Sequence, residues 1–296
     1  MKKSGLEENR FERWHPLTQL LYYVSVITLV TVRMNPIIIA VTFVSTALLG
    51  ALMGKRKFAK MFFMIYIPAS LIAVIINPLF SHEGITILEY FPSGNPLTLE
   101  SVVYGVAGGV MVCGICALFY SFNIVMTSDR IMYLTAKIMP AISLTISMSL
   151  RFIPEFKRHM GQVSRSCGCV MKNGGKIRNG IAVFESMVMW SFEKSIERSD
   201  SMRARGYGVM RRTSYSKYKF TKVDAAYALL IILVFIFVLV NILCGNIYAQ
   251  YYPYFMIEGN GAAAAMTYVS YAFLTALPAI DIIRENIRWK LLKSKI

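Results

Sequence analysis

Apolar positions form six long runs along the chain, and polar positions gather between them. Each run has 16 to 26 residues, and a helix needs about 20 apolar residues to cross a bilayer. The runs are Leu17–Val32, Ile37–Met53, Met61–Phe80, Ser101–Met126, Val223–Ile247 and Gly261–Ile283. We therefore expect an all-α polytopic membrane protein with about six transmembrane helices.

The composition agrees with a membrane protein and excludes several other classes. Of the 296 residues, 56% are hydrophobic and only 16% are charged, whereas a soluble domain normally has about 25% charged residues. A soluble enzyme, a disordered tail and a nucleic-acid-binding arm are therefore excluded for the chain as a whole. We expect the lipid bilayer, and no nucleic acid, as a partner.

The basic residues are distributed unevenly between the loops. If the N-terminus is cytoplasmic, 31 of the 32 Lys and Arg residues fall on the cytoplasmic side, and only Arg33 falls outside. Cytoplasmic loops of membrane proteins are enriched in Lys and Arg. This bias predicts a multi-pass protein of the cell membrane with both termini in the cytoplasm.

The chain carries no recognisable catalytic motif. It has no Walker A sequence, no His-Glu-x-x-His and no Gly-x-Ser-x-Gly, and its three histidines are scattered. No apolar run has an ionisable residue near its centre, where an ion-coupled carrier usually needs one. We expect neither an enzyme nor a metal or cofactor site in this chain.

The most informative stretch lies between the fourth and fifth runs, and it divides the chain into three regions. Residues 1–126 form a membrane body with four spans, residues 127–222 an interfacial and cytoplasmic region, and residues 223–296 the last two spans with a basic C-terminus. Ile131–Leu150 contains Lys137 and Pro140, so we expect a broken helix there that is interfacial or partly embedded in the membrane. Pro154 suits the first turn of the next helix, where its missing N–H costs nothing.

Two amphipathic helices follow, separated by a break at Asn173-Gly174-Gly175. Both have apolar residues at alternating steps of three and four, the spacing of one helical face. The first face carries Phe156, Met160, Val163, Cys167 and Val170, and the second carries Ile177, Ile181, Phe184, Val188, Phe192 and Ile196.

The second amphipathic helix ends at Arg203-Ala204-Arg205-Gly206. Gly206 suits the left-handed position that closes a helix, and arginines in a last turn favour the negative end of the helix dipole. The arginines could therefore be simple caps. They could also pair with a carboxylate on a soluble partner, or the basic helix could lie on anionic lipid.

Small residues at Gly105 and Gly109 indicate close helix packing within a span. This packing could serve the chain itself or form a groove for a partner.

Several segments, taken in order, resemble one family of membrane proteins. They are His15-Pro16-Leu17-Thr18-Gln19-Leu20, Asn77-Pro78-Leu79-Phe80, Met126-Thr127-Ser128-Asp129-Arg130, Leu150-Arg151-Phe152-Ile153-Pro154 and Ala204-Arg205-Gly206-Tyr207. The chain resembles the transmembrane coupling subunit, or T component, of energy-coupling factor (ECF) transporters, which are ATP-binding-cassette importers. A second arginine motif of that family is matched only by Arg165, in Ser164-Arg165-Ser166-Cys167-Gly168.

The resemblance implies a non-catalytic subunit with two cytoplasmic coupling helices. Arg203, Ala204, Arg205 and Gly206, together with Arg165, would dock on two ABC-type ATPase subunits, and His15, Pro16, Asn77, Arg151 and Pro154 would be structural motif residues. ATP and Mg²⁺ would be used by the ATPases, and their motion would pass to one membrane substrate-binding S component. The imported substrate would be a vitamin or a transition-metal ion.

Three alternatives stay open beside this reading. They are a self-contained secondary transporter, a membrane-embedded enzyme, and a membrane scaffold whose basic helices bind lipid.

Overall fold

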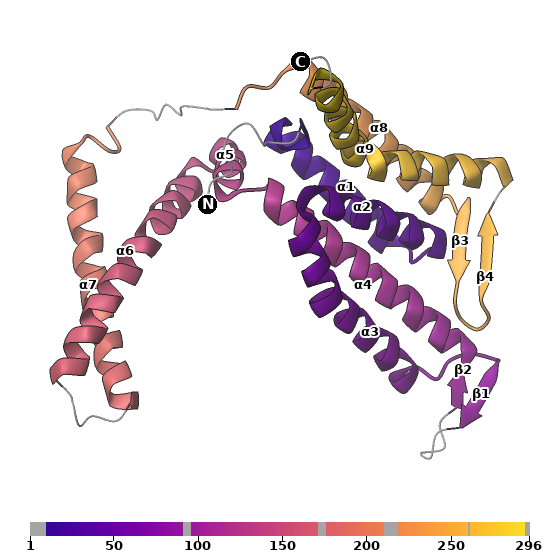
Figure 1. Cartoon of the computed structure of the whole chain (residues 1–296), viewed down its shortest axis with the longest axis horizontal. Coiled ribbons are helices and arrows are strands. Elements are labelled where there is room, and N and C mark those ends of the chain that lie inside the picture. The colour runs from indigo at the N-terminus through magenta and orange to yellow at the C-terminus, as the bar shows by residue number, and fades with distance from the viewer. Residues whose placement is uncertain (1–9, 91–95, 171–175, 210–217, 260, 294–296) are drawn as a thin grey trace. The chain divides into compact units, whose positions relative to one another are not determined.

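Helices dominate the computed structural model, which describes residues 10–90, 96–170, 176–209, 218–259 and 261–293 (Figure 1). The chain divides into two compact units. Unit 1 contains Met1–Thr127 and Tyr218–Ile296, and unit 2 contains Ser128–Lys217.

Unit 1 consists mainly of apolar helices. They are the 3-10 helix η1 (Arg10–Arg13), α1 (Pro16–Val32), α2 (Pro36–Met61), the π-helix η2 (Phe62–Tyr66), α3 (Ile67–Phe80), α4 (Leu99–Val125), α8 (Lys222–Leu243) and α9 (Gly261–Lys293). Within the described residues, 5 helical segments are long and apolar enough to cross a membrane: Pro36–Gly54, Arg56–Phe80, Leu99–Val125, Lys222–Leu243 and Gly261–Lys293. The chain is thus an all-α multi-pass membrane protein, as predicted. Helix α1 is apolar but has only 17 residues, so the count of six spans stays a prediction.

The second and third apolar segments meet without a loop, although the basic residues between them were expected to form one. Gly54 (φ −158°, ψ 58°) is the only non-helical residue within α2, and Lys55–Met61 continue as helix into η2. A Cβ atom at Gly54 would lie 2.3 Å from the Tyr120 hydroxyl oxygen on α4. Glycine therefore allows the chain to turn tightly against α4.

Helices α3 and α4 approach so closely that backbone meets backbone. A Cβ atom at Gly105 would lie 2.8 Å from the Val74 carbonyl oxygen, and one at Gly109 would lie 2.8 Å from the Ser70 carbonyl oxygen. The small residues at these positions therefore allow helices of the same chain to pack closely. Of the two uses considered for this motif, internal packing is favoured over a groove for a partner.

Hydroxyl groups link α1, α2 and α9 in the middle of unit 1. The hydroxyls of Thr42 and Tyr271 lie 2.6 Å apart, and those of Ser45 and Thr275 lie 3.0 Å apart. Tyr22 donates its hydroxyl to the Thr275 carbonyl oxygen at 3.0 Å. Such neutral hydrogen bonds join helices without placing a charge in the apolar layer.

Two hairpins occupy the loops that were expected outside the membrane. Strand β1 (Ile87–Tyr90) pairs antiparallel with β2 (Pro96–Thr98), and β3 (Ile247–Gln250) pairs with β4 (Met256–Gly259). The short strands were not predicted, because neither loop shows a clear alternation of apolar and polar residues.

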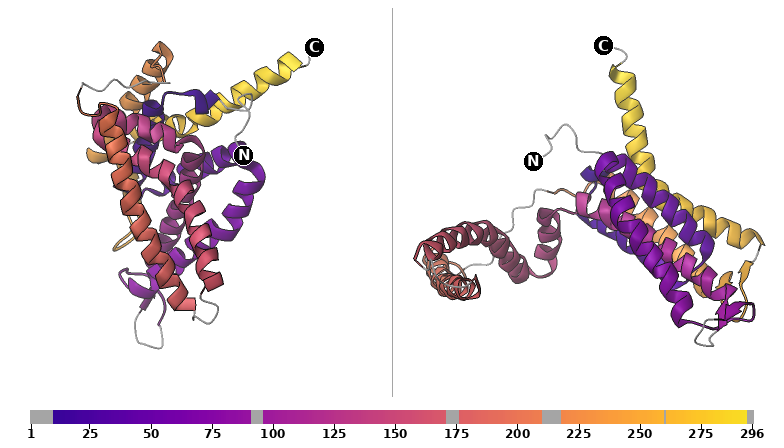
Figure 2. Two further views of the ribbon diagram at one scale, coloured as in Figure 1. Left: turned by 90° about the vertical axis from the view of Figure 1, so that its left-hand side faces the viewer. Right: turned by 60° about the horizontal axis from the view of Figure 1, so that its bottom comes forward.

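The last two helices end at other positions than predicted. Helix α8 stops at Leu243 instead of Ile247, because Gly245 adopts φ +79° and the Asn246 N–H donates to the Asn241 carbonyl oxygen, the bond of a Schellman cap. Helix α9 continues past Ile283 to Lys293 and, in Figure 2, extends away from the other helices of unit 1. Lys and Arg have high helix propensity, so the helix can continue through these residues. Their charges mean that this part of α9 does not belong to an apolar span.

Unit 2 contains α5 (Ser128–Ile138), α6 (Pro140–Val170) and α7 (Lys176–Ala204). The break predicted within 131–150 is confirmed, and Pro140 starts α6. The prediction that Pro154 begins a helix is wrong, because Pro154 lies inside α6. Rings on both sides of it, Phe152 and Phe156, pack on Trp190 of α7, which offsets the backbone hydrogen bond lost at proline. The break predicted at Asn173-Gly174-Gly175 lies outside the described residues.

The glycine contacts between α3 and α4 can be tested with a matched pair of variants. Gly109→Ala places its methyl group 2.6 Å from the Val74 Cγ2 atom, whereas at Gly108 the nearest atom would be Met34 Cε at 3.7 Å. We expect Gly109→Ala to lower the free energy of unfolding by about 1–3 kcal/mol, the usual cost of overpacking. Thermal unfolding in detergent measures the effect. Gly108→Ala should be at least as stable as the parent, because alanine favours a helix more than glycine does, and equal melting temperatures for both variants would contradict the close packing.

Candidate functional site

Helices α6 and α7 form a crossed antiparallel pair that carries the predicted arginine motifs (Figure 1). Trp190 lies at the crossing, where His159 stacks on it with ring centroids 4.3 Å apart and Phe152 approaches to 5.3 Å. Arg198 forms an ion pair with Glu155 and lies 4.6 Å from the centre of the Phe152 ring. Aromatic packing and one ion pair therefore hold the two helices together.

The pair partly covers one predicted apolar face, on which Met160 stays exposed, and leaves the other open. On α6, Phe156, Val163 and Cys167 are half-buried, as a face turned to α7 should be. On α7, Met187 is buried to 3% exposure, whereas the predicted face is open, with Phe184 at 71% and Phe192 at 67%. Within the described part of unit 2, nothing covers this apolar stripe of α7.

The end of α7 is closed by backbone hydrogen bonds. Gly206 adopts φ +79° and donates its N–H to the Arg203 carbonyl oxygen at 2.9 Å, and the Tyr207 N–H donates to the Met202 carbonyl oxygen at 3.0 Å. These two bonds are those of a Schellman motif. The prediction that Gly206 takes the left-handed closing position is confirmed, and the Met202 and Arg203 carbonyl groups are satisfied without any arginine side chain.

The arginines of this motif, Arg203 and Arg205, are exposed and form no ion pair within the described residues. Ala204 between them is exposed as well. Arg165 is also exposed, and its Nε donates to the Gly161 carbonyl oxygen on its own helix at 3.0 Å.

The two arginine motifs lie at opposite ends of the helix pair. Ser164 and Cys167 line one small cavity with Asn179 and Gly180, near the start of α7. About 25 residues separate Gly180 from Arg205 along α7, and at 1.5 Å per residue this is roughly 38 Å. One small binding site cannot reach both motifs.

An apolar groove of about 760 Å³ runs between the helices and reaches the Arg205 end. Its walls include three flexible methionines, Met148, Met160 and Met202, together with Phe152 and Phe156. Methionine side chains adapt easily to a partner's shape, so the groove suits apolar side chains of a docking protein.

The other predicted motif residues are distributed over both units. Arg151 and Pro154 are exposed on α6. Asn77 belongs to α3 in unit 1, and its buried Oδ1 atom has no hydrogen-bond partner among the described residues.

His15 and Pro16 start α1 in unit 1 and connect it to α8. His15 is the N-cap, its Nδ1 accepts from the Leu17 N–H, and Pro16 occupies the first turn. The His15 backbone N–H donates to the Asp224 carboxylate at 3.0 Å. Their role in the structure is therefore helix capping and attachment of the N-terminal segment.

Sequence reasoning missed the residues that hold the helix pair together, namely Glu155, Trp190 and Arg198. Trp190 follows Met187 by three residues on the covered face of α7. This spacing was the only available signal, and it is less regular than the apolar stripe through Phe184 and Phe192.

Further along α7, Lys194 and Glu197 are hydrogen-bonded at 2.5 Å, and this bond raises the pKa of Lys194 and lowers the pKa of Glu197.

Neither the described residues nor the sequence comparisons identify a metal site or a protein family. Within the described ranges, no group of three or more His, Cys, Asp or Glu side chains could hold a metal ion. Comparison of the sequence with protein-family models gives no match, and comparison with curated proteins gives none either. The function must therefore be argued from the geometry of the residues themselves.

The helix cap at Gly206 gives a local test of this geometry. Gly206→Ala forces a residue with a Cβ atom into a left-handed conformation, at a cost of roughly 1–2 kcal/mol. We expect the amides near residues 203–208 to exchange with deuterium about 5- to 30-fold faster. The control is Gly161→Ala, which adds a methyl group with nothing within 4 Å and should not speed exchange. Unchanged exchange in Gly206→Ala would contradict the cap.

Proposed function

We propose that this chain is the transmembrane coupling subunit of an ECF-type importer. The observation that carries the proposal is the pair of exposed arginine motifs at opposite ends of α6 and α7. In this role the chain passes the ATP-driven motion of two ATPase subunits to a membrane S component. It catalyses no reaction itself, and ATP and Mg²⁺ bind to the ATPases.

The closed end of α7 favours partner binding by Arg205 over simple capping. The carbonyl groups of the last turn already accept from Gly206 and Tyr207, so the guanidinium is left for another ligand. An arginine fork binds a carboxylate through two parallel hydrogen bonds, which lysine cannot reproduce. An acidic groove on a soluble partner is therefore the ligand that Arg205 suits best.

The distance between the motifs supports two docking sites. With roughly 38 Å between them along α7, Arg205 and Arg165 would each bind a different ATPase subunit. The crossing at Trp190 would make the pair move as one body, because His159, Phe152 and Arg198 connect the helices there. A change in the spacing of the ATPases would then be transmitted through α6 and α7.

We further propose six spans in the cell membrane, with α1 as the first and both termini in the cytoplasm. Nine of the 17 residues of α1 are buried, so neighbouring helices would support this short span. The S component would lie against the membrane helices and α7, and it would supply the site for a vitamin or transition-metal ion.

The exposed stripe of α7 favours a second candidate function. Ile181, Phe184 and Phe192 are all more than 60% exposed, and an apolar stripe on a helix with basic residues can lie on anionic lipid. The chain would then be a membrane scaffold without ATPase partners.

Arg205→Ala tests the docking role. Removing one member of a buried charge pair costs about 2–5 kcal/mol, or roughly 30- to several-thousand-fold in affinity. We expect Arg205→Ala to abolish substrate uptake by cells and to reduce the amount of ATPase that copurifies. Arg205→Lys should restore little, because the fork is lost, and Arg165→Ala should have a milder effect.

Arg158→Ala is the matched control, since Arg158 is an exposed arginine near the middle of α6 that lines neither the groove nor the cavity at Ser164. It should leave uptake and copurification unchanged. Normal uptake and normal ATPase recovery in Arg205→Ala would overturn the coupling role. Binding of the purified chain to anionic vesicles through Phe184 and Phe192, with no ATPase recovered, would favour the scaffold.

Single cysteines in a cysteine-free background test the orientation. Glu89 on β1 and Ser164 on α6 are both exposed. We expect Glu89→Cys in intact cells to react with an impermeant thiol reagent and Ser164→Cys to react only after the membrane is opened. Labelling of Ser164→Cys from outside would reject the proposed topology.

A further inference from the structure

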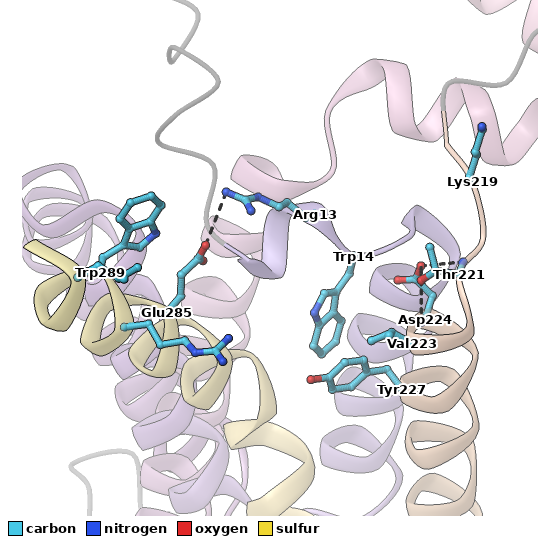
Figure 3. Close-up of a pocket in the computed structure, with 11 residues that line it drawn as sticks. Arg13, Trp14, Lys219, Thr221, Val223, Asp224, Tyr227, Glu285 and Trp289 are labelled. Carbon is cyan, nitrogen blue, oxygen red and sulfur yellow. Dashed lines mark hydrogen bonds and ion pairs between the residues drawn. The ribbon is translucent and has the colours of Figure 1, made fainter.

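Unit 1 contains a cavity of about 500 Å³ where α8 begins and α9 leaves the bundle (Figure 3). Its walls come from η1, the segment before α8, the first turns of α8 and the C-terminal part of α9. Among the lining residues are Arg13, Trp14, Lys219, Asp224, Arg288 and Trp289.

The cavity lies where α8 and α9 change from polar to apolar sequence, and so at the boundary of the apolar layer. Helix α8 is apolar from Ala225 onward, and α9 turns polar after Ile283. The cavity lies between these two ends, and tryptophans line it on two sides, as Figure 3 shows for Trp14 and Trp289. Tryptophan is enriched at the depth of the lipid headgroups.

The acidic groups of the cavity already have partners. Asp224 accepts hydrogen bonds from the Thr221 hydroxyl at 2.6 Å and from the His15 backbone N–H at 3.0 Å. Glu285 lies 3.6 Å from Arg13 in an ion pair. The ion pair compensates the charge of Glu285, and the hydrogen bonds hold the Asp224 carboxylate in place.

Two cations of the cavity are left for a ligand. Among the described residues, no ion pair involves Lys219 or Arg288, and both side chains are exposed. With Arg13 they give the cavity three basic groups against two acidic groups. Val223 and Leu292 add apolar wall beside them.

We propose that this cavity binds the phosphate-bearing headgroup of an anionic phospholipid. Basic pockets between membrane helices are a recurrent site for such headgroups. Lys219 and Arg288 supply positive charge that attracts the phosphate, Trp14 and Trp289 line the cavity at the boundary of the apolar layer, and Val223 and Leu292 offer apolar wall to the first part of an acyl chain. The proposal does not depend on the coupling function, because none of these residues belongs to the arginine motifs.

The test measures lipid binding to the full-length chain purified in a zwitterionic detergent. Native mass spectrometry counts bound phosphatidylglycerol and, separately, phosphatidylcholine. A Lys or Arg near an anionic lipid surface contributes about fivefold in affinity, so Lys219→Gln combined with Arg288→Gln should weaken phosphatidylglycerol binding about 25-fold. Phosphatidylcholine binding should be weak in the parent and unchanged in the variant.

The matched control removes the same amount of charge from positions outside the cavity. Lys290→Gln combined with Lys293→Gln changes two basic residues of α9 that do not line the cavity, and it should retain the parent's affinity. An unchanged melting temperature in lipid-free detergent shows that both variants are folded.

Three results would overturn the proposal. They are equal loss of phosphatidylglycerol in the two double variants, equal binding of phosphatidylcholine and phosphatidylglycerol by the parent, and displacement of the lipid by millimolar glycerol phosphate. The last result would assign the cavity to a soluble phosphate ester.

Discussion

A bilayer offers no hydrogen-bond partners to a peptide backbone, and this constraint governs the whole of unit 1. Every segment that can span the membrane is helical, so its backbone groups are satisfied within the segment. The acidic residues nearest the apolar layer stand at its edge and are supplied with donors. Asp281 accepts from the Trp14 indole and the Tyr227 hydroxyl, each at 3.2 Å, and Asp224 accepts from Thr221 and His15.

The same constraint explains how the membrane helices are held together. Burying apolar side chains gains little when the alternative environment is lipid, so close contact and neutral hydrogen bonds must contribute. The glycines of α4 let the α3 backbone approach, and the hydroxyls of Thr42 and Ser45 bond to α9. The charges of unit 1 are thereby kept for the ends of its helices, where the basic side chains of the cavity lie.

Different interactions hold unit 2 together, because its helices carry many charges and contact each other at one crossing. Trp190 and the Arg198–Glu155 pair join α6 and α7 near their middles, while both arginine motifs stay exposed near the ends. In the proposed coupling role, the two ends would bind different partners, and the crossing would let a partner at one end influence what is bound at the other.

Local signals in the sequence were sufficient to predict five of the apolar spans, the helix break before Pro140 and the cap at Gly206. Each of these depends on residues within a few positions of one another, since a span follows from a run of apolar residues and a cap from one glycine. The predicted part of the candidate site, Arg203 to Gly206, belongs to this class. The coupling role of these residues came from the resemblance of short ordered motifs to one family, and that role is a proposal.

Contacts between distant residues were decided only by the tertiary structure. The covered face of α7 is the one with Met187 and Trp190, because these side chains meet α6, whereas the more regular apolar stripe stays open. Pro154 continues α6 because rings on both sides of it pack on Trp190, which lies far away in the sequence. The cavity joins residues from η1, α8 and α9 for the same reason. Periodicity identifies which residues can share a face, but only packing determines what that face meets.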